Sequence, residues 1–163
     1  MKKWFALVLV LGLVSGANAA LTLVGVPTEP IGIGEIVTIT VANDVGGSYS
    51  GWLEIETPAV ADFASDPEFT PAANPSGMSE IKLWPEFGAS YEFSIISFPP
   101  SPAIGAGEHV VVHLVGVSEG STQLSLYASD RTTLLDQCTI AVIPEPMTVA
   151  LLGIGGLLLR RRK

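Results

Sequence analysis

The sequence predicts an all-β fold over residues 20–143, a two-sheet β-sandwich of jelly-roll type with about eight strands. Three observations predict this fold. Apolar and polar residues alternate in short runs. Glycine and proline separate the runs, as turns require. Apart from two apolar terminal segments, no window longer than a turn or two keeps a helical period, so the strands must supply the core.

The expected strands follow one another at short intervals. In the second of them, Val37, Ile39 and Val41 form one face, while the residues between them form the other. A short helix is expected over 58–64, because proline is favoured at the first helical position, and a loop is expected over 66–77. The predicted strands are 21–26, 35–42, 52–57, 81–84, 91–98, 109–114, 124–127 and 138–142.

Part of this layout resembles the jelly rolls of the cohesin and carbohydrate-binding-module superfamily. The residues that carry the resemblance are Gly34–Val41, Trp52–Ile55, and the late pair of runs Val110–Val117 and Thr122–Tyr127. The resemblance implies the sandwich fold and a role in adhesion at a surface.

The first 19 residues predict a secretory signal peptide. Two lysines at 2–3 precede an apolar run at 5–14, and Ala17 and Ala19 form a small-x-small cleavage site. The run is too short to span a bilayer, which takes ~20 apolar residues. We therefore expect the Sec-type machinery to export the chain, with cleavage after Ala19 or after Ala20.

The last 20 residues, 144–163, predict a membrane anchor. Pro144 and Pro146 bracket Glu145 and disfavour helix, so an extended, accessible peptide is expected. The apolar run 147–159 follows, and as a helix it is roughly 20 Å long at ~1.5 Å per residue. We expect a single transmembrane helix that includes Met147, Leu151, Leu152, Ile154, Leu157, Leu158 and Leu159, with Arg160, Arg161, Arg162 and Lys163 on the cytoplasmic side.

This tail resembles the PEP-CTERM sorting signal of Gram-negative bacteria that build extracellular polymeric matrix. The resemblance rests on the order of the Pro144–Pro146 motif, the short glycine-bearing apolar run and the basic cluster at 160–163. It implies processing by an exosortase, a membrane enzyme with a cysteine nucleophile, with Pro144, Glu145 and Pro146 as substrate positions. The chain would be held at the inner membrane in transit and then reach the cell surface or extracellular matrix. An ordinary anchor that is never processed is the alternative.

Charge is distributed unevenly along the chain. The net charge of −8 comes from 8 basic and 16 acidic residues, and six of the basic residues lie at the two ends. Only Lys82 and Arg131 remain in between, so the stretch 4–159 carries 2 − 16 = −14. Such a surface repels phosphate backbones, which argues against nucleic acid as a partner.

The chemistry-bearing residues predict no catalytic site, metal centre or cofactor. His109 and His113 lie roughly 13 Å apart on a strand at ~3.3 Å per residue, so one ion cannot join them, and both are expected to face solvent. Cys138, in line with Ile140 and Val142, is expected to be a buried structural thiol, with pairing to a second molecule in an oxidising compartment as the alternative. Glu54 and Glu56 share a strand face and are interpreted as a solvated acidic surface rather than a glycosidase pair.

Structural calcium is the one metal alternative, because loop oxygens build such sites and acidic or amide side chains cluster near the strand ends, although no EF-hand spacing is present. The residues concerned are Asn43, Asp44, Asp62, Asp66, Glu68, Asp130 and Asp136.

The aromatic residues leave two functions open. Trp52 and Trp84, with Tyr49 and Tyr91, would stack on sugar rings if they lined one exposed sheet face, whereas core packing is the usual role of such residues. We therefore predict an exported, non-catalytic cell-surface or matrix protein with a structural or adhesive role. The alternative is a carbohydrate-binding module acting on matrix polysaccharide, with Trp52 and Trp84 as the ligand contacts.

Overall fold

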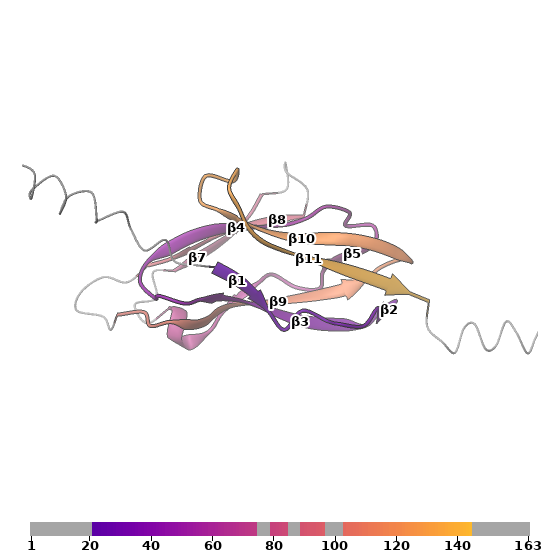
Figure 1. Cartoon of the computed structure of the whole chain (residues 1–163), viewed down its shortest axis with the longest axis horizontal. Coiled ribbons are helices and arrows are strands. Elements are labelled where there is room, and N and C mark those ends of the chain that lie inside the picture. The colour runs from indigo at the N-terminus through magenta and orange to yellow at the C-terminus, as the bar shows by residue number, and fades with distance from the viewer. Residues whose placement is uncertain (1–20, 75–78, 85–88, 97–102, 145–163) are drawn as a thin grey trace, which may run out of the picture.

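Two β-sheets pack face to face in a computed structural model that describes residues 21–74, 79–84, 89–96 and 103–144 (Figure 1). The first sheet has the order β1 (Leu21–Val24), β3 (Ile36–Asn43), β9 (Gly107–Gly116), β5 (Ala61–Phe63), and β6 (Glu68–Phe69) also pairs with β9. The second sheet has the order β2 (Ile31–Gly32), β11 (Leu134–Ile143), β10 (Gly120–Ala128), β4 (Tyr49–Ile55), β8 (Ser90–Ile95), β7 (Glu80–Leu83). The described part of the chain is therefore an all-β sandwich, as predicted.

Alternation along the strands produces the core between the two sheets. In β3, Ile39 and Val41 are fully buried, and in β10 Leu124 and Leu126 are fully buried. Neighbouring strands pair antiparallel, except that β2 runs parallel to β11. The predicted signal peptide and Glu145–Lys163 lie outside the described residues. In the described part no helix is long and apolar enough to cross a membrane.

The predicted helix at 58–64 is wrong. A turn spans residues 58–60, and Ala61–Phe63 form the short strand β5 on the edge of β9. The Ala64 backbone N–H then donates to the His113 carbonyl at 2.7 Å. Pairing with an open strand edge satisfies these backbone groups and outweighs the local preference for a helical turn.

The predicted loop at 66–77 contains ordered structure in its described part. The strand β6 pairs with β9, and a 3-10 turn, η1 (Pro71–Ala73), follows it with proline at its start. Two- and three-residue strands such as β2, β5 and β6 carry no sequence period, so the alternation pattern does not predict them.

A β-bulge changes which way one histidine faces. Val41 pairs with Val110, but the next residue, Ala42, pairs with Glu108, so His109 is an extra residue in β9. Its side chain is only 1% exposed, and the prediction that His109 faces solvent is therefore wrong. His113, beyond the bulge, is half-buried and its Nδ1 lies 3.0 Å from the Thr38 hydroxyl.

Candidate functional site

The outer face of the second sheet places polar and aromatic side chains in rows across its strands. Trp52 of β4 lies opposite Tyr127 of β10 on one side and Glu92 of β8 on the other. Glu92 in turn lies opposite Lys82 of β7. Because side chains directly opposite one another share a face, residues far apart in sequence form one continuous surface.

Two tryptophans meet on this face. The rings of Trp52 and Trp84 have centroids 5.8 Å apart at an angle of 41°. The Trp84 indole N–H donates to a Glu92 carboxylate oxygen at 3.0 Å, and the Lys82 ammonium lies 3.7 Å from the centre of the Trp84 ring. Trp84 is half-buried, whereas Trp52 is only 8% exposed although it belongs to the outer face.

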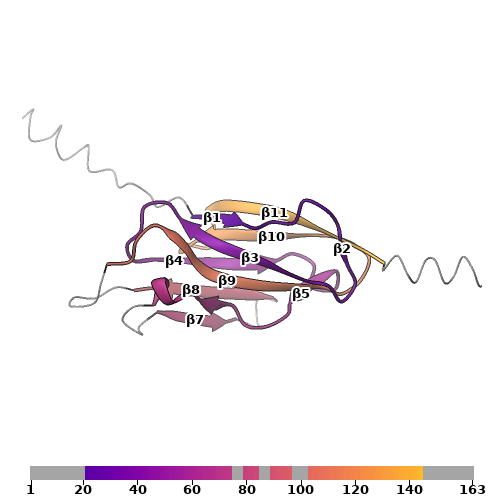
Figure 2. The ribbon, with the colours of Figure 1, turned by 90° about the horizontal axis from the view of Figure 1, so that it is seen from below.

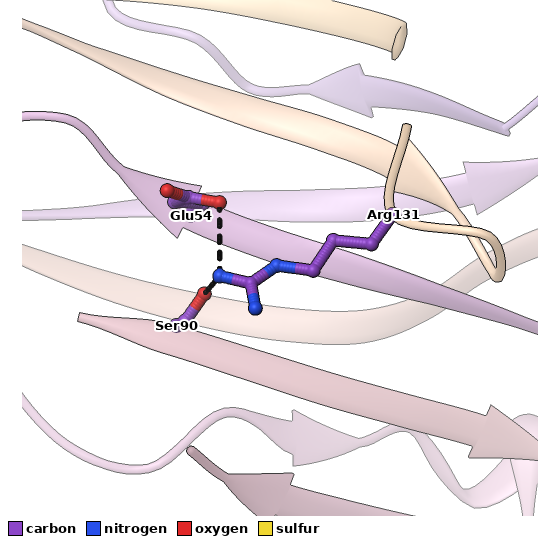
Figure 3. Close-up of polar contacts among 3 residues, drawn as sticks. All are labelled: Glu54, Ser90 and Arg131. Atoms are coloured by element: carbon purple, nitrogen blue, oxygen red, sulfur yellow. Dashed lines mark hydrogen bonds and ion pairs between the residues drawn. The ribbon is translucent and has the colours of Figure 1, made fainter. Parts of the chain in front are cut away.

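Arg131, in the β10–β11 hairpin, lies over the ring of Trp52. Its guanidinium carbon lies 4.8 Å from the Trp52 ring centre, a cation–π distance. Figure 3 shows one guanidinium nitrogen reaching both the Glu54 carboxylate at 3.5 Å and the Ser90 hydroxyl at 3.4 Å. One side chain from the hairpin therefore joins groups on β4 and β8.

The hairpin conformation directs Arg131 over the sheet. Arg131 has φ of +57°, in the left-handed region, and its N–H donates to the Ala128 carbonyl at 2.9 Å. Asp130 accepts from the Thr132 and Thr133 N–H groups at 3.0 and 2.9 Å, and from the Thr133 hydroxyl at 2.7 Å. These hydrogen bonds stabilise the charged carboxylate and hold the pKa of Asp130 well below its usual range.

Charge gives this surface its distinct character. The only two lysine or arginine residues of the stretch 4–159 both lie here, each over a tryptophan, in a stretch with 16 acidic residues. A hollow of about 200 Å³ lies beside Lys82, which lines it together with Glu80, Glu92 and Ser94. We name the set Trp52, Trp84, Lys82, Arg131, Glu54 and Glu92 the tryptophan–cation patch.

The two tyrosines that the sequence groups with the tryptophans lie elsewhere. The Tyr91 side chain lies between the sheets, where its hydroxyl donates to Asp66 at 2.6 Å and its ring packs edge-on against Phe63. The Tyr49 hydroxyl is hydrogen-bonded to Nδ1 of His109, and the two rings stack. Because a strand exposes alternate residues on opposite faces, these tyrosines take no part in the patch.

Burial shifts the pKa of several interior groups. Desolvation lowers the pKa of His109, and a hydrogen bond with the Gly105 backbone opposes this shift. Desolvation raises the pKa of Tyr49. Burial, together with the charge of Asp136, raises the pKa of Cys138 to about 11. Cys138 is half-buried against the core, so its thiol is protonated at neutral pH.

The carboxylates and amides considered for calcium mostly serve the backbone. Asn43 accepts from the N–H groups of Val45 and Gly46, and Asp136 accepts from the Leu23 N–H at 2.8 Å. In the described ranges, no group of three or more histidine, cysteine, aspartate or glutamate side chains is placed to hold a metal ion.

Arg131 is the functional candidate that sequence reasoning missed. The signal available was its isolation: a lone arginine in an acidic domain, three residues after the end of β10 at Ala128. Sequence spacing alone does not show that the hairpin folds back over β4, since that depends on the β10–β4 pairing.

The fold is that of the cohesin modules. A solved non-cellulosomal cohesin from the archaeon Archaeoglobus fulgidus has a TM-score of 0.51 and 13% identity, and the match covers 82% of this chain and 97% of that one. A cohesin module of a family 33 glycoside hydrolase from Clostridium perfringens has a TM-score of 0.54 and 12% identity, with coverage of 78% and 100%.

A third similar structure is part of a complex. It comes from a type I cohesin–dockerin complex of Clostridium thermocellum, with a TM-score of 0.51, 10% identity and coverage of 76% and 97%. No family model matches the chain, and no curated protein matches it. At identities this low, the structural similarity establishes the fold alone.

Proposed function

We propose that this chain is an exported, non-catalytic module that binds a partner protein through the outer face of its second sheet. The fold supports the class of function, since one of the similar structures was solved with a dockerin bound. The observation that carries the proposal is the tryptophan–cation patch. Tryptophan and arginine are the residues in which binding energy most often concentrates at protein interfaces.

The geometry of the patch favours a protein partner. Its tryptophans are held in place by Arg131 and Glu92, so little side-chain entropy remains to be lost on binding. Lys82 is exposed beside a shallow hollow, and it offers a cation to an acidic group of a partner. The surrounding negative charge of the module disfavours partners that are acidic throughout.

The polysaccharide alternative gains no support from the same residues. Sugar rings stack on the open face of an indole, and here Lys82 lies over Trp84 while Trp52 is 8% exposed beneath its neighbours. A sugar would first have to displace these cations. Binding of matrix polysaccharide through Trp52 and Trp84 therefore stays a prediction.

A site-specific crosslinking experiment tests the interaction. A photoreactive amino acid replaces Lys82 in the patch or, as the control, Thr38, which is exposed on the first sheet. We expect a protein adduct of discrete mass from position 82 only, and we expect it to be lost when Trp84→Ala is added. Equal adducts at both positions, or none at 82, would refute the proposal, and carbohydrate in the adduct would favour the polysaccharide alternative.

We also propose that the tail anchors this module and directs it through an exosortase to the cell surface or matrix. The support is the order of the Pro144–Pro146 motif, apolar run and basic cluster in the sequence. Mass spectrometry of material released from the producing cells tests this step. We expect the released chain to lack Arg160–Lys163 and Glu145→Ala to abolish release, whereas retention of the four basic residues on released chain would show that no processing occurs.

A further inference from the structure

Four exposed apolar side chains gather at the end of the sandwich where β11 ends. They are Ile33, Ile36, Val117 and Ile143, with exposures of 37%, 60%, 45% and 43%. We name this set the apolar end. A soluble surface exposes single apolar side chains routinely, whereas a group of branched aliphatic residues at one place marks a contact with something apolar.

Backbone hydrogen bonds hold the apolar end together. The Ile33 N–H donates to the Ile143 carbonyl at 3.2 Å, and Ile33 forms an isolated bridge with Gly116. The residue after Gly116 is Val117, whose N–H donates to the Val60 carbonyl at 2.8 Å. Figures 1 and 2 show β2, the start of β3 and the ends of β9 and β11 at the same end of the molecule.

Very little chain separates this end from the tail's apolar run. Ile143 is the last paired residue of β11, and only Pro144, Glu145 and Pro146 stand between it and Met147. Four Cα steps span at most roughly 14 Å at ~3.5 Å each. The headgroup layer of one leaflet is about 5–7 Å thick. A tail inserted through 147–159 therefore holds the apolar end against the headgroups.

We propose that the apolar end packs on the surface of the lipid bilayer. This inference rests on the anchoring proposed above. A tether of three residues makes docking intramolecular, so a surface too small to bind membranes alone is sufficient. Glu35 and Glu119 lie at the same end, whereas none of the lysine or arginine residues that the structure describes lies there. The negative charge of this end therefore favours zwitterionic lipid over anionic lipid.

This placement explains how the patch stays available. The strands run along the length of the sandwich, and β11 ends at one end of it (Figure 2). The tail continues the sequence from that strand. With that end on lipid, both sheets stand upright from the membrane. The tryptophan–cation patch then faces sideways, open to a partner beside the same membrane.

Fluorescence quenching in vesicles tests the inference. The full chain is exported in a host without exosortase, purified from its membranes and reconstituted in phosphatidylcholine vesicles, with Cys138→Ser and one new cysteine carrying a fluorophore. Glu119→Cys labels the apolar end, and Ser129→Cys labels the hairpin at the opposite end; both positions are exposed. Flotation of the vesicles reports anchoring, and nitroxide on the lipid headgroups reports contact.

We expect both proteins to float with the vesicles and only the label at 119 to be quenched. Ile36→Ser with Val117→Ser should lower the ratio of docked to undocked module about thirtyfold. About half of each of these two side chains is exposed and would be buried by docking on lipid, and each substitution removes that contribution. Val45→Ser with Leu135→Ser, which removes exposed apolar residues at the opposite end, should leave the quenching unchanged.

Each other result overturns the inference in an identifiable way. Floating protein with equal quenching at 119 and 129 leaves the anchor intact and refutes lipid packing. If the label at 119 becomes shielded from solvent as protein density rises, but is not quenched by the nitroxide, the apolar end packs on a second copy of the chain instead of on lipid. Protein that does not float refutes the anchoring, and the packing with it. Stronger quenching in anionic vesicles would contradict the charge argument.

Discussion

Removing the Tyr49 hydroxyl should destabilise the module, because that hydroxyl is the partner of a buried histidine. In Tyr49→Phe the Nδ1 atom of His109, which is 1% exposed, loses its hydrogen bond inside the sandwich. A buried polar atom left without a partner costs about 1–3 kcal/mol. For a domain of this size each kcal/mol lowers Tm by roughly 4 °C, so we expect a decrease of about 4–12 °C.

Acid should act on the same pair. Because burial lowers the pKa of His109 in the folded chain, the unfolded chain binds a proton at this histidine more readily than the folded chain does. The free energy of unfolding therefore falls as pH drops below the ordinary histidine pKa of about 6.5, by at most about 1.4 kcal/mol per pH unit. His109→Gln should remove this slope between about pH 7 and pH 5.5, above the range in which exposed carboxylates titrate.

Urea unfolding followed by tryptophan fluorescence measures both effects. Tyr127→Phe is the matched control, because Tyr127 is half-buried on the outer face of the second sheet, away from His109. The reasoning fails if Tyr127→Phe costs as much as Tyr49→Phe. It also fails if the wild-type chain is equally stable at both pH values.

Two further predictions address the packing. Gly116→Ala should lower the free energy of unfolding in urea by about 1–3 kcal/mol, because its Cβ would lie 2.5 Å from the Gly32 carbonyl oxygen. Gly105→Ala is the control and should change the free energy of unfolding very little, because a Cβ there meets nothing within 4 Å. Equal losses in the two variants would contradict the register of β2. Because the pKa of Cys138 is raised to about 11, little thiolate is present at pH 8 in the folded chain, so its alkylation should be about a hundredfold slower than in urea. Mass spectrometry measures the two rates. Equal rates would contradict the burial of Cys138.

The strand pattern was predictable because it depends on local alternation. Ile39, Val41, Leu124 and Leu126 are fully buried, as the two-residue period of their strands predicts. His109 was not predictable in the same way. The bulge that turns it inward exists only because β3 and β9 pair with one residue in excess, and pairing between strands that are far apart in sequence leaves no local signal.

The patch shows the same division. Its tryptophans were singled out from the sequence, but their rings meet only because β4, β8 and the chain after β7 are neighbours in the sheet. Arg131 joins them through a hairpin that Asp130 shapes. Glu54, interpreted from the sequence as part of a solvated acidic face, is instead the partner of that arginine.

The sequence by itself determined the class of fold, the alternation of buried and exposed residues, and the shortage of cations between the two ends, because these are properties of neighbouring residues and of composition. The tertiary structure alone decided which side chains share a surface. It placed both remaining cations over tryptophans and gathered Ile33, Ile36, Val117 and Ile143 at the end of the sandwich where β11 ends. Strand order decides such encounters, and it is settled by the packing of the whole sandwich.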